Sequence, residues 1–213
     1  EVGELSFGVG PFPSATLARS VIEKIRVQYP KVALQTEIAS PAELLTMLTR
    51  EEIEFFVADT GDMVTVPFLH IEPLMRQYGH LYARYDHPLA HKAHTFEDAW
   101  TYGIASVKLP DPLKAGLGQL LQQSKRNLPQ LALECDDVHL LHQLALNTDT
   151  VVASTDIAAK PWLRQKQLVQ LNTTDFPRLF SNISIVNLSN RALSPVADFA
   201  IEQFRQTAKQ SFD

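Results

Sequence analysis

Three histidines stand close together in the stretch HPLAHKAH, at positions 87, 91 and 94. Imidazoles one helical turn apart can share a zinc ion, so the spacing raises the question of a metal site. Pro88 follows His87 directly, however, and the residue before a proline disfavours helical geometry. The stretch therefore predicts a loop, and no cysteine or carboxylate within it completes a set of ligands. We expect neither a metal nor a cofactor.

Cys135 is the single cysteine of the chain, and His139 and His142 follow it. A thiol becomes a nucleophile where a neighbouring base takes its proton, which would be enzyme chemistry. Both histidines lie on the helix predicted after Cys135, without a demonstrable face in common with it, and lone cysteines are usually small buried hydrophobes. The chain has no G-x-S-x-G, P-loop or G-x-G-x-x-G motif. The sequence therefore predicts that the protein is not an enzyme.

The composition indicates an ordinary globular protein. The 213 residues are 45% hydrophobic and 20% charged, and 19 basic against 24 acidic residues give a formal net charge of −5. Such a chain lacks the electrostatic footprint of a module that holds nucleic acid by itself. No apolar run approaches the ~20 residues of a membrane span, and no signal peptide is visible. A single cysteine fits a reducing compartment, so we expect a cytoplasmic protein without membrane contact.

The elements that must position these residues alternate between strands and helices. Alternating or apolar runs predict strands at 5–9, 31–39, 53–59, 80–85, 102–107, 130–135, 149–154, 168–172 and 183–188. Helical spacing predicts helices at 14–29, after Ser40, and at 95–100, 112–127, 136–147, 155–164 and 195–206. The segment PFPS reads as a loop, with Ser14 as the N-cap of the first helix. Strand–helix–strand units of this kind are typical of parallel α/β sheets.

The order of the elements predicts two α/β units. The final helix needs a sheet to cover, and the first unit is its expected host. The domains are then 1–76 plus 182–213, which is discontinuous, and 77–181, with two crossings between them. Ligands of open α/β sheets bind beyond the carboxyl ends of the strands, where helix N-termini point. We expect the effector in a cleft between the units.

Several segments, in order, resemble the effector-binding (regulatory) domain of LysR-type transcriptional regulators. GELSFGVG, followed by IRVQYPKVALQTE, is similar to the family's opening G-L-x-I-G … F-x-x-x-Y-P-x-V-x-L. Four later segments are also similar to family segments: AELLTMLTREEIEFFVAD, LMRQYGHLYARYDHPLA, VHLLHQLALNTDTVVAST and LSPVADFAIEQFRQ. The chain departs from the pattern at Arg19, at Ile53-Glu54 and at 147–150. In this resemblance, HPLA marks the end of the second unit's first strand.

The resemblance implies a fold and a mode of action. The fold would be two Rossmann-like subdomains joined by two crossover strands, like a type 2 periplasmic binding protein. The family's N-terminal winged helix-turn-helix is absent from these residues, so DNA would be bound only through that missing domain. Family members pair their first helix with the helix that corresponds to 119–127, which implies a homodimer or tetramer. Polar faces of this kind are more commonly just solvated, and it is the resemblance that favours the dimer.

The candidate effector-binding residues follow the predicted strand ends. They are Gly10, Phe12, Pro13, Ser14, Ser40, Lys108, Cys135 and Asp136. Helix N-termini and Lys108 would suit a carboxylate, whereas Phe12 and the two prolines favour an aromatic or more apolar metabolite. Each residue also has a structural interpretation: the serines and Asp136 as helix caps, and Lys108 as a solvated side chain.

The predicted function is a small-molecule sensor for a transcription regulator. Effector binding would be relayed through rearrangement of the dimer or tetramer to the DNA-binding half. The alternative is a periplasmic-type solute-binding protein for a small organic anion, which shares the two-unit architecture. A helix-turn-helix upstream in the full gene would favour the first function, and a signal peptide the second.

Overall fold

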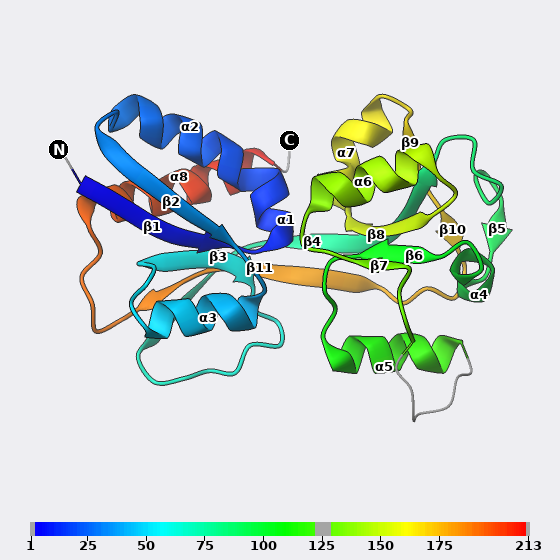
Figure 1. Cartoon of the computed structure of the whole chain (residues 1–213), viewed down its shortest axis with the longest axis horizontal. Helices are drawn as coiled ribbons and strands as arrows, with labels where there is room; N and C mark the ends of the chain where they lie inside the picture. Colours follow the sequence, from blue (N-terminus) through cyan, green and yellow to red (C-terminus); the bar gives the residue numbers. More distant parts are fainter. Residues whose placement is uncertain (1–2, 122–128, 212–213) are drawn as a thin grey trace. The chain divides into compact units, whose positions relative to one another are not determined.

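The computed structural model describes residues 3–121 and 129–211, and the chain forms two compact units. Unit 1 comprises Glu1–Gln77 and Ser181–Asp213, and unit 2 comprises Tyr78–Phe180. Two strands run through both units, namely β4 (Leu69–Arg84) and β11 (Leu179–Leu188). The chain therefore passes from one unit to the other twice (Figure 1).

The sheet of unit 1 contains three parallel strands, which are β1 (Gly3–Val9), β2 (Val32–Ile38) and β3 (Phe55–Asp59). They lie in the order β2-β1-β3, and β11 follows as an antiparallel neighbour of β3. Every residue of β3 except Asp59 is buried, as expected for a strand covered on both faces. The mixed α/β architecture of the prediction is confirmed.

The first helix of unit 1 begins earlier than predicted. It starts at Pro11 and continues without a break through α1 (Pro11–Pro13), the π-helical segment η1 (Ser14–Ala18) and α2 (Arg19–Gln28). Gly10 is the N-cap, so the predicted loop and the assignment of Ser14 as N-cap were wrong. Proline interrupts a helix interior but is favoured in the first turn, because its fixed φ suits the helix and its missing N–H has no helical partner there.

The remaining helices of unit 1 are α3 (Pro41–Thr49) and α8 (Pro195–Gln210). Both begin with a serine N-cap followed by proline, as predicted from Ser40 and Ser194. The core of the unit is built around three phenylalanines that are fully buried. The rings of Phe7 and Phe55 stack with centroids 5.3 Å apart, and Phe204 from α8 meets both edge-on at 6.1 Å. One helix near the C-terminus thus completes a core that begins in β1.

Unit 2 contains sheet strands in the order β4-β8-β6-β7, with β9 antiparallel to β4, and a separate two-stranded sheet in which β5 pairs with β10. Its strands are β5 (Ala93–His94), β6 (Ile104–Ser106), β7 (Leu133–Glu134), β8 (Val151–Thr155), β9 (Leu168–Gln170) and β10 (Asn172–Thr173). Its helices are α4 (Phe96–Trp100), α5 (Asp111–Leu120), α6 (Val138–Asn147) and α7 (Asp156–Arg164). The predicted helix 112–127 matches α5 in part, and its residues 122–127 lie outside the described part of the chain.

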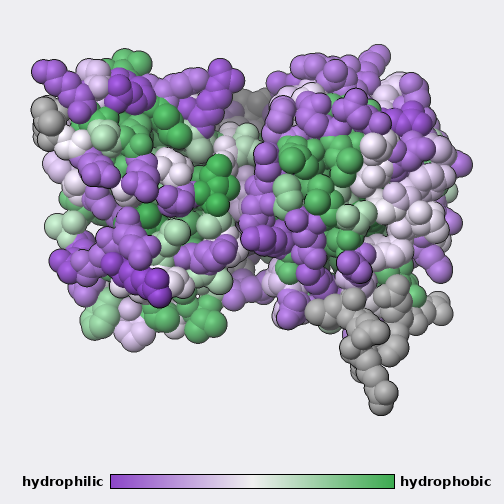
Figure 2. Space-filling view, viewed as in Figure 1, coloured by the Kyte–Doolittle hydropathy of each residue, from purple (hydrophilic) through white to green (hydrophobic). Residues whose placement is uncertain are grey.

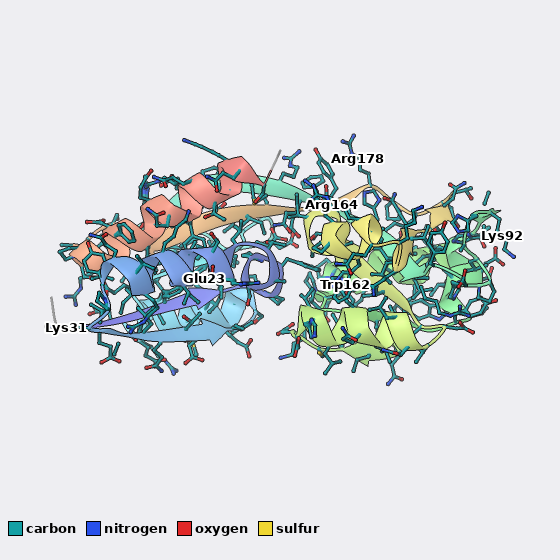
Figure 3. The ribbon with its side chains drawn as sticks, turned by 90° about the horizontal axis from the view of Figure 1, so that it is seen from above. Glu23, Lys31, Lys92, Trp162, Arg164 and Arg178 are labelled. Atoms are coloured by element: carbon teal, nitrogen blue, oxygen red, sulfur yellow. The ribbon has the colours of Figure 1, made fainter. Side chains whose placement is uncertain are left out.

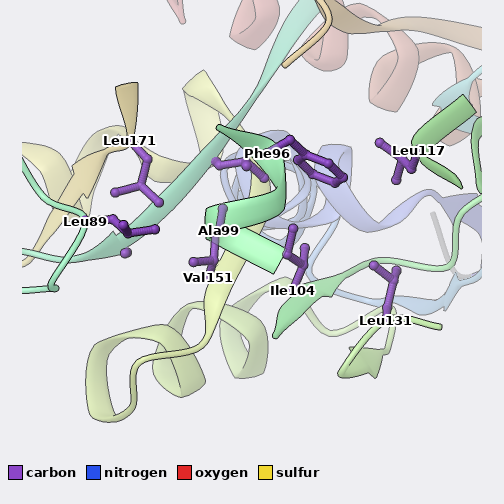
Figure 4. Packing of buried hydrophobic residues seen from close by; sticks show 10 residues of the cluster. Leu89, Phe96, Ala99, Ile104, Leu117, Leu131, Val151 and Leu171 are labelled. Carbon is purple, nitrogen blue, oxygen red and sulfur yellow. The ribbon is translucent and has the colours of Figure 1, made fainter. Parts of the chain in front are cut away.

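Apolar clusters pack around the sheet of unit 2. One of them joins residues of the sheet with residues of α4 and α5, and its members include Leu89, Phe96, Ala99, Ile104, Leu117, Leu131, Val151 and Leu171 (Figure 4). A second cluster joins Tyr82 and Ala105 to Leu141 on α6 and Ala159 on α7. On the face that Figure 2 shows, hydrophobic residues of each unit form separate patches with hydrophilic residues between them. Such scattered exposure is normal for a globular protein.

In the stretch HPLAHKAH, residues 87–92 form a loop, as the Pro88 argument predicted, whereas the last two residues form the short strand β5. His87 is 3% exposed, and its Nδ1 accepts the Leu89 N–H at 3.0 Å. The other ring nitrogen, Nε2, therefore carries the proton and donates to the Asp149 carbonyl at 2.9 Å. His94 bonds to Lys92 and Thr173, and His91 packs on Tyr85. These histidines have structural partners within unit 2.

Candidate functional site

The strand ends of unit 1 bring the first group of candidate residues to one edge of the sheet. Val9 pairs with Ile38 and with Val57 in parallel register, so the residues after β1, β2 and β3 follow the same edge. Gly10 approaches β3 closely: a Cβ added to it would lie 3.1 Å from Ala58 Cβ. A larger residue at position 10 would push the first turn of α1 away from the sheet.

Few N–H groups are present in the first helical turn that follows β1. Pro11 and Pro13 have none, and the Ser14 N–H donates to the Gly10 carbonyl at 2.9 Å. Phe12 supplies the remaining N–H of the turn, and its ring is partly buried. Ser14 lies inside the helix and is partly exposed. This turn is therefore a weaker anion site than an ordinary helix N-terminus.

Ser40 has the structural role that its position before Pro41 indicated. Its hydroxyl accepts the Glu43 N–H and lies 2.7 Å from the Glu43 carboxylate, which also accepts the Ser40 N–H at 3.0 Å. This reciprocal arrangement is a capping box. The hydroxyl is occupied by its own helix, and Glu43 places a negative charge at the helix N-terminus.

Removing these two hydroxyls should have different consequences. Ser40→Ala should lower the free energy of unfolding by about 1 kcal/mol, because the capping box loses its acceptor. Ser14→Ala should change it by less than about 0.5 kcal/mol, because the hydroxyl caps no helix. Urea unfolding followed by circular dichroism would measure both. An equal loss in the two variants would contradict the assignment of the cap to Ser40.

The strand ends of unit 2 bring Lys108 and Asp136 together. Ser106 on β6 pairs with Glu134 on β7 in parallel register, so the residues that follow the two strands lie side by side. The Lys108 N–H donates to Asp136 Oδ1 at 3.2 Å, and Lys108 Nζ lies 3.7 Å from Asp136 Oδ2. Lys108 is therefore ion-paired, although its side chain is 59% exposed, so the prediction of a solvated side chain holds in part.

Cys135 directly precedes Asp136 and is partly buried. Its N–H donates to the Ser106 carbonyl at 3.0 Å, and its Sγ accepts the Asp137 N–H at 3.4 Å. Asp137, rather than Asp136, is the N-cap of α6 and accepts the Leu140 N–H at 3.0 Å. Cys135 thus stabilises the turn into α6 through its sulfur.

Two carboxylates at these strand ends were not predicted. Glu134 Oε1 lies 2.7 Å from Lys114 Nζ, and its Oε2 accepts the Leu109 N–H at 3.4 Å. Asp156 Oδ1, after β8, accepts the N–H groups of Tyr78 at 3.0 Å and Ile157 at 2.9 Å. The signal available in the sequence was the run of acids at the ends of the predicted strands, in ECDD and STD.

Both ring nitrogens of His142 have structural partners. His142 is 2% exposed, and its Nδ1 accepts the Trp162 N–H at 3.0 Å. Nε2 therefore carries the proton, and it donates to Ser154 Oγ at 2.8 Å. Burial lowers the pKa of His142 to about 4, which keeps the ring neutral. Figure 3 shows Trp162 on α7, next to α6. The trio holds α6, α7 and β8 together.

Unit 1 also contains a hollow that none of the candidate residues lines. Its volume is about 370 Å³, and β4, β11 and α8 supply most of its walls. Arg205 forms a fork with both carboxylate oxygens of Glu72, each at 2.8 Å, and also bonds to Glu202. The Arg205 guanidinium lowers the pKa of Glu72. This arginine ties α8 to β4 rather than offering a free charge.

The described residues include no group of three or more histidines, cysteines or carboxylates placed to hold a metal ion. Among the described helices, none has the length and apolar character needed to cross a membrane.

Comparison with known proteins identifies the family. The family model described as LysR substrate binding domain matches residues 1–212. The SDS degradation transcriptional activation protein of Pseudomonas sp. (strain ATCC 19151) is 30% identical over 203 residues. The match covers 92% of this chain and 64% of that protein, so the chain spans less than two thirds of its relative.

Solved structures with low sequence identity share the fold. The effector binding domain of QuiR in complex with shikimate has a TM-score of 0.70 at 14% identity, with 99% of both chains covered. A mutant of OxyR from Corynebacterium glutamicum, H₂O₂-bound, has a TM-score of 0.63 at 18% identity, with 99% of this chain and 66% of that chain covered. The predicted resemblance and the fold class, like that of type 2 periplasmic binding proteins, are confirmed, and the family does not favour the solute-transport alternative. The chain belongs to the LysR substrate-binding domain family.

Proposed function

We propose that the chain is the effector-sensing domain of a LysR-type transcriptional regulator and that it binds a small molecule at the carboxyl ends of its parallel strands. The observation that supports this most is the convergence of the candidate residues within each unit. Gly10, Phe12 and Ser40 follow neighbouring strands of unit 1, whereas Lys108 and Asp136 follow neighbouring strands of unit 2. Loops at this edge are where α/β folds hold their ligands.

The relatives suggest classes of effector for this chain. Shikimate and H₂O₂ are named for two structural neighbours, and they differ in size and charge. The relative at 30% identity is named for SDS degradation, which makes an alkyl sulfate or a product of its breakdown a reasonable candidate. Phe12 offers an aromatic surface at the end of β1 that suits the apolar part of such a molecule.

We further propose that the domain works as a homodimer or tetramer and reaches DNA through a separate helix-turn-helix domain. Effector binding would change the assembly only if the ligand prefers one arrangement over another. The first helix, 11–28, supplies one of the two surfaces that the family resemblance implies. Part of the second surface, 122–127, lies outside the described residues.

Phe12→Ala should weaken effector binding at least about ten-fold, because a ring at the proposed site loses its apolar contact. The purified chain would first be screened by thermal shift against shikimate, alkyl sulfates and primary alcohols, since a ligand that binds the folded state raises the melting temperature. Titration calorimetry would then compare the variants for each compound that binds.

Phe68→Ala is the matched control for that experiment. Phe68 is 63% exposed and lies in the same unit. Its carbonyl accepts the N–H of Ser189, which follows one end of β11, whereas Asp59 at the end of β3 pairs with the other end of β11. The control variant should leave the affinity unchanged. Equal affinities of the wild-type chain and Phe12→Ala would contradict the proposed location of the effector.

A further inference from the structure

The buried amide of Gln77, on β4, has no role in the site described above. Gln77 is 0% exposed, the lowest value among the buried Ser, Thr, Gln and His side chains of the described residues. An amide removed from water is stable only when its polar atoms have partners. The contacts of Gln77 therefore indicate what this side chain holds in place.

Gln77 is bonded to the first helix through Thr16. Its Nε2 donates to Thr16 Oγ1 at 3.1 Å, and the Thr16 hydroxyl donates to the Phe12 carbonyl at 2.8 Å. Both directions are fixed, because a carbonyl can only accept a hydrogen bond and an amide nitrogen can only donate one. The Thr16 proton therefore points at Phe12, and a lone pair of the same oxygen receives the Gln77 N–H. Met75 Sδ lies 3.7 Å from the amide nitrogen.

Thr16 is the central residue of η1, the π-helical segment Ser14–Ala18. A π-helical turn contains about one residue more than an α-helical turn, is rare, and is often found at functional sites. Since an α-helix turns by about 100° per residue, the added residue rotates the preceding turn by roughly that angle, compared with a continuous α-helix. The direction in which Phe12 points therefore depends on whether residues 14–18 are π-helical or α-helical.

The start of the first helix has few backbone bonds of its own that could select a register. Pro11 and Pro13 have no N–H to donate. Further along, Val21 and Ile25 are fully buried and fix α2 in the core of unit 1. The helix is therefore held firmly after η1 and weakly before it. Under these conditions, a side-chain hydrogen bond from a neighbouring strand can decide between the two registers.

Thr46 shows that a threonine in a helix does not by itself produce a π-helical turn. Its hydroxyl donates to the Ala42 carbonyl at 3.0 Å, which is the same bond to the fourth residue before it. α3 is nevertheless α-helical throughout. Among the described residues, Thr46 Oγ1 has no further partner, whereas Thr16 Oγ1 also accepts the Gln77 N–H. The bond that Thr16 has and Thr46 lacks is the one from β4.

We infer that Gln77 is a positioning residue of the proposed effector site: through Thr16 it holds residues 14–18 in the π-helical register, and so it sets the direction in which Phe12 points after β1. The inference rests on the proposed function, because Gln77 acts on an effector only through the turn that contains Phe12. Gln77 is the last residue of unit 1 before β4 passes into unit 2. A strand that joins the two units is therefore bonded to the turn that would hold the effector.

The register can be tested without an effector. A 4-fluorophenylalanine placed at position 12 gives one fluorine NMR resonance that reports the surroundings of this ring. Gln77→Met removes the amide at nearly constant side-chain length, and Thr16→Val removes the hydroxyl at a partly exposed position. Both variants should move the resonance to the same new position, because both release the same turn. Thr16→Ser, which keeps the hydroxyl, and the control Thr46→Val should leave it in place. An unchanged resonance in Gln77→Met or in Thr16→Val would overturn the inference.

Titration calorimetry tests the effect on binding, with shikimate, 1-octanol and octyl sulfate below its micelle-forming concentration as probes. For a compound that binds, Gln77→Met and Thr16→Val should each weaken binding at least about five-fold. The double variant should weaken it no further than the more affected single variant, because both changes remove the same bond. Thr16→Ser and Thr46→Val should stay within about two-fold of the wild-type chain. Losses that multiply in the double variant would show independent effects and overturn the inference.

Phe12→Ala separates failure of the inference from failure of the proposed function. If Phe12→Ala weakens the binding of a compound while Gln77→Met and Thr16→Val do not, the site stands and Gln77 has no positioning role. If no compound binds saturably, or if Phe12→Ala weakens none of those that bind, the proposed site is contradicted. The role of Gln77 towards an effector then falls with it, whatever the fluorine resonance shows.

Discussion

Phe204→Ala should lower the free energy of unfolding of unit 1 by about 3–5 kcal/mol, the usual loss for a large aromatic residue removed from a packed core. The ring is fully buried and meets Phe7 and Phe55 edge-on at 6.1 Å. Alanine would leave a cavity in the layer between α8 and the sheet. The two remaining rings are held by β1 and β3, so they cannot close it.

Urea unfolding with two probes measures this loss. Both tryptophans, Trp100 and Trp162, lie in unit 2, so their fluorescence reports that unit, whereas circular dichroism reports both. For a slope of about 2 kcal/mol per molar urea, the transition of unit 1 should move down by roughly 2 M. Phe68→Ala, at a 63% exposed position, should move it by less than about 0.5 M. Similar shifts in both variants would contradict the role of Phe204.

Acid should destabilise the chain through His142. Its pKa is about 4 in the folded chain, against 6.5 when exposed, because burial opposes the charged ring. Above pH 6.5 both states are neutral at this residue, and its effect on stability is small. As the pH falls from 6.5 towards 4, His142 becomes protonated in the unfolded chain but stays neutral in the folded chain. The free energy of unfolding therefore decreases. Between pH 7.5 and 5 the loss is about 2 kcal/mol.

The matched variant is His142→Gln, which cannot titrate. It should be less stable than the wild-type chain at pH 7.5, because Trp162 and Ser154 lose their partner. Between pH 7.5 and 5, the free energy of unfolding of this variant should fall by about 2 kcal/mol less than that of the wild-type chain. Urea midpoints from tryptophan fluorescence at several pH values give both profiles. Parallel profiles would show that His142 does not cause the acid sensitivity.

The sequence predicted those elements whose signal is local. Ser40 and Ser194, each before a proline, predicted the starts of α3 and α8 because caps depend on adjacent residues. The strand predicted at 80–85 is the end of a sixteen-residue strand, β4. Its first part contains Pro73, a residue that strand interiors usually avoid, so local preference gave no indication of it.

The site was predictable to a smaller extent. Strand ends predicted which residues gather at one edge, but not which of them bond to each other. Lys108 meets Asp136 and Lys114 meets Glu134 because β6 and β7 pair in parallel, and that pairing joins residues far apart in the chain. The anion-binding character expected from Lys108 could not be assessed without those partners. Contact of the effector with all eight candidate residues stays a prediction.

The discontinuity of unit 1 has a consequence for synthesis on the ribosome. The residues of unit 2 are contiguous, from Tyr78 to Phe180, so this unit can complete its fold as soon as they emerge. Unit 1 begins first but cannot finish, because β3 lacks its neighbour β11 and the phenylalanine core lacks α8. During translation the nascent chain must therefore carry an open sheet edge and uncovered aromatic rings, which are sites for chaperone capture and for aggregation.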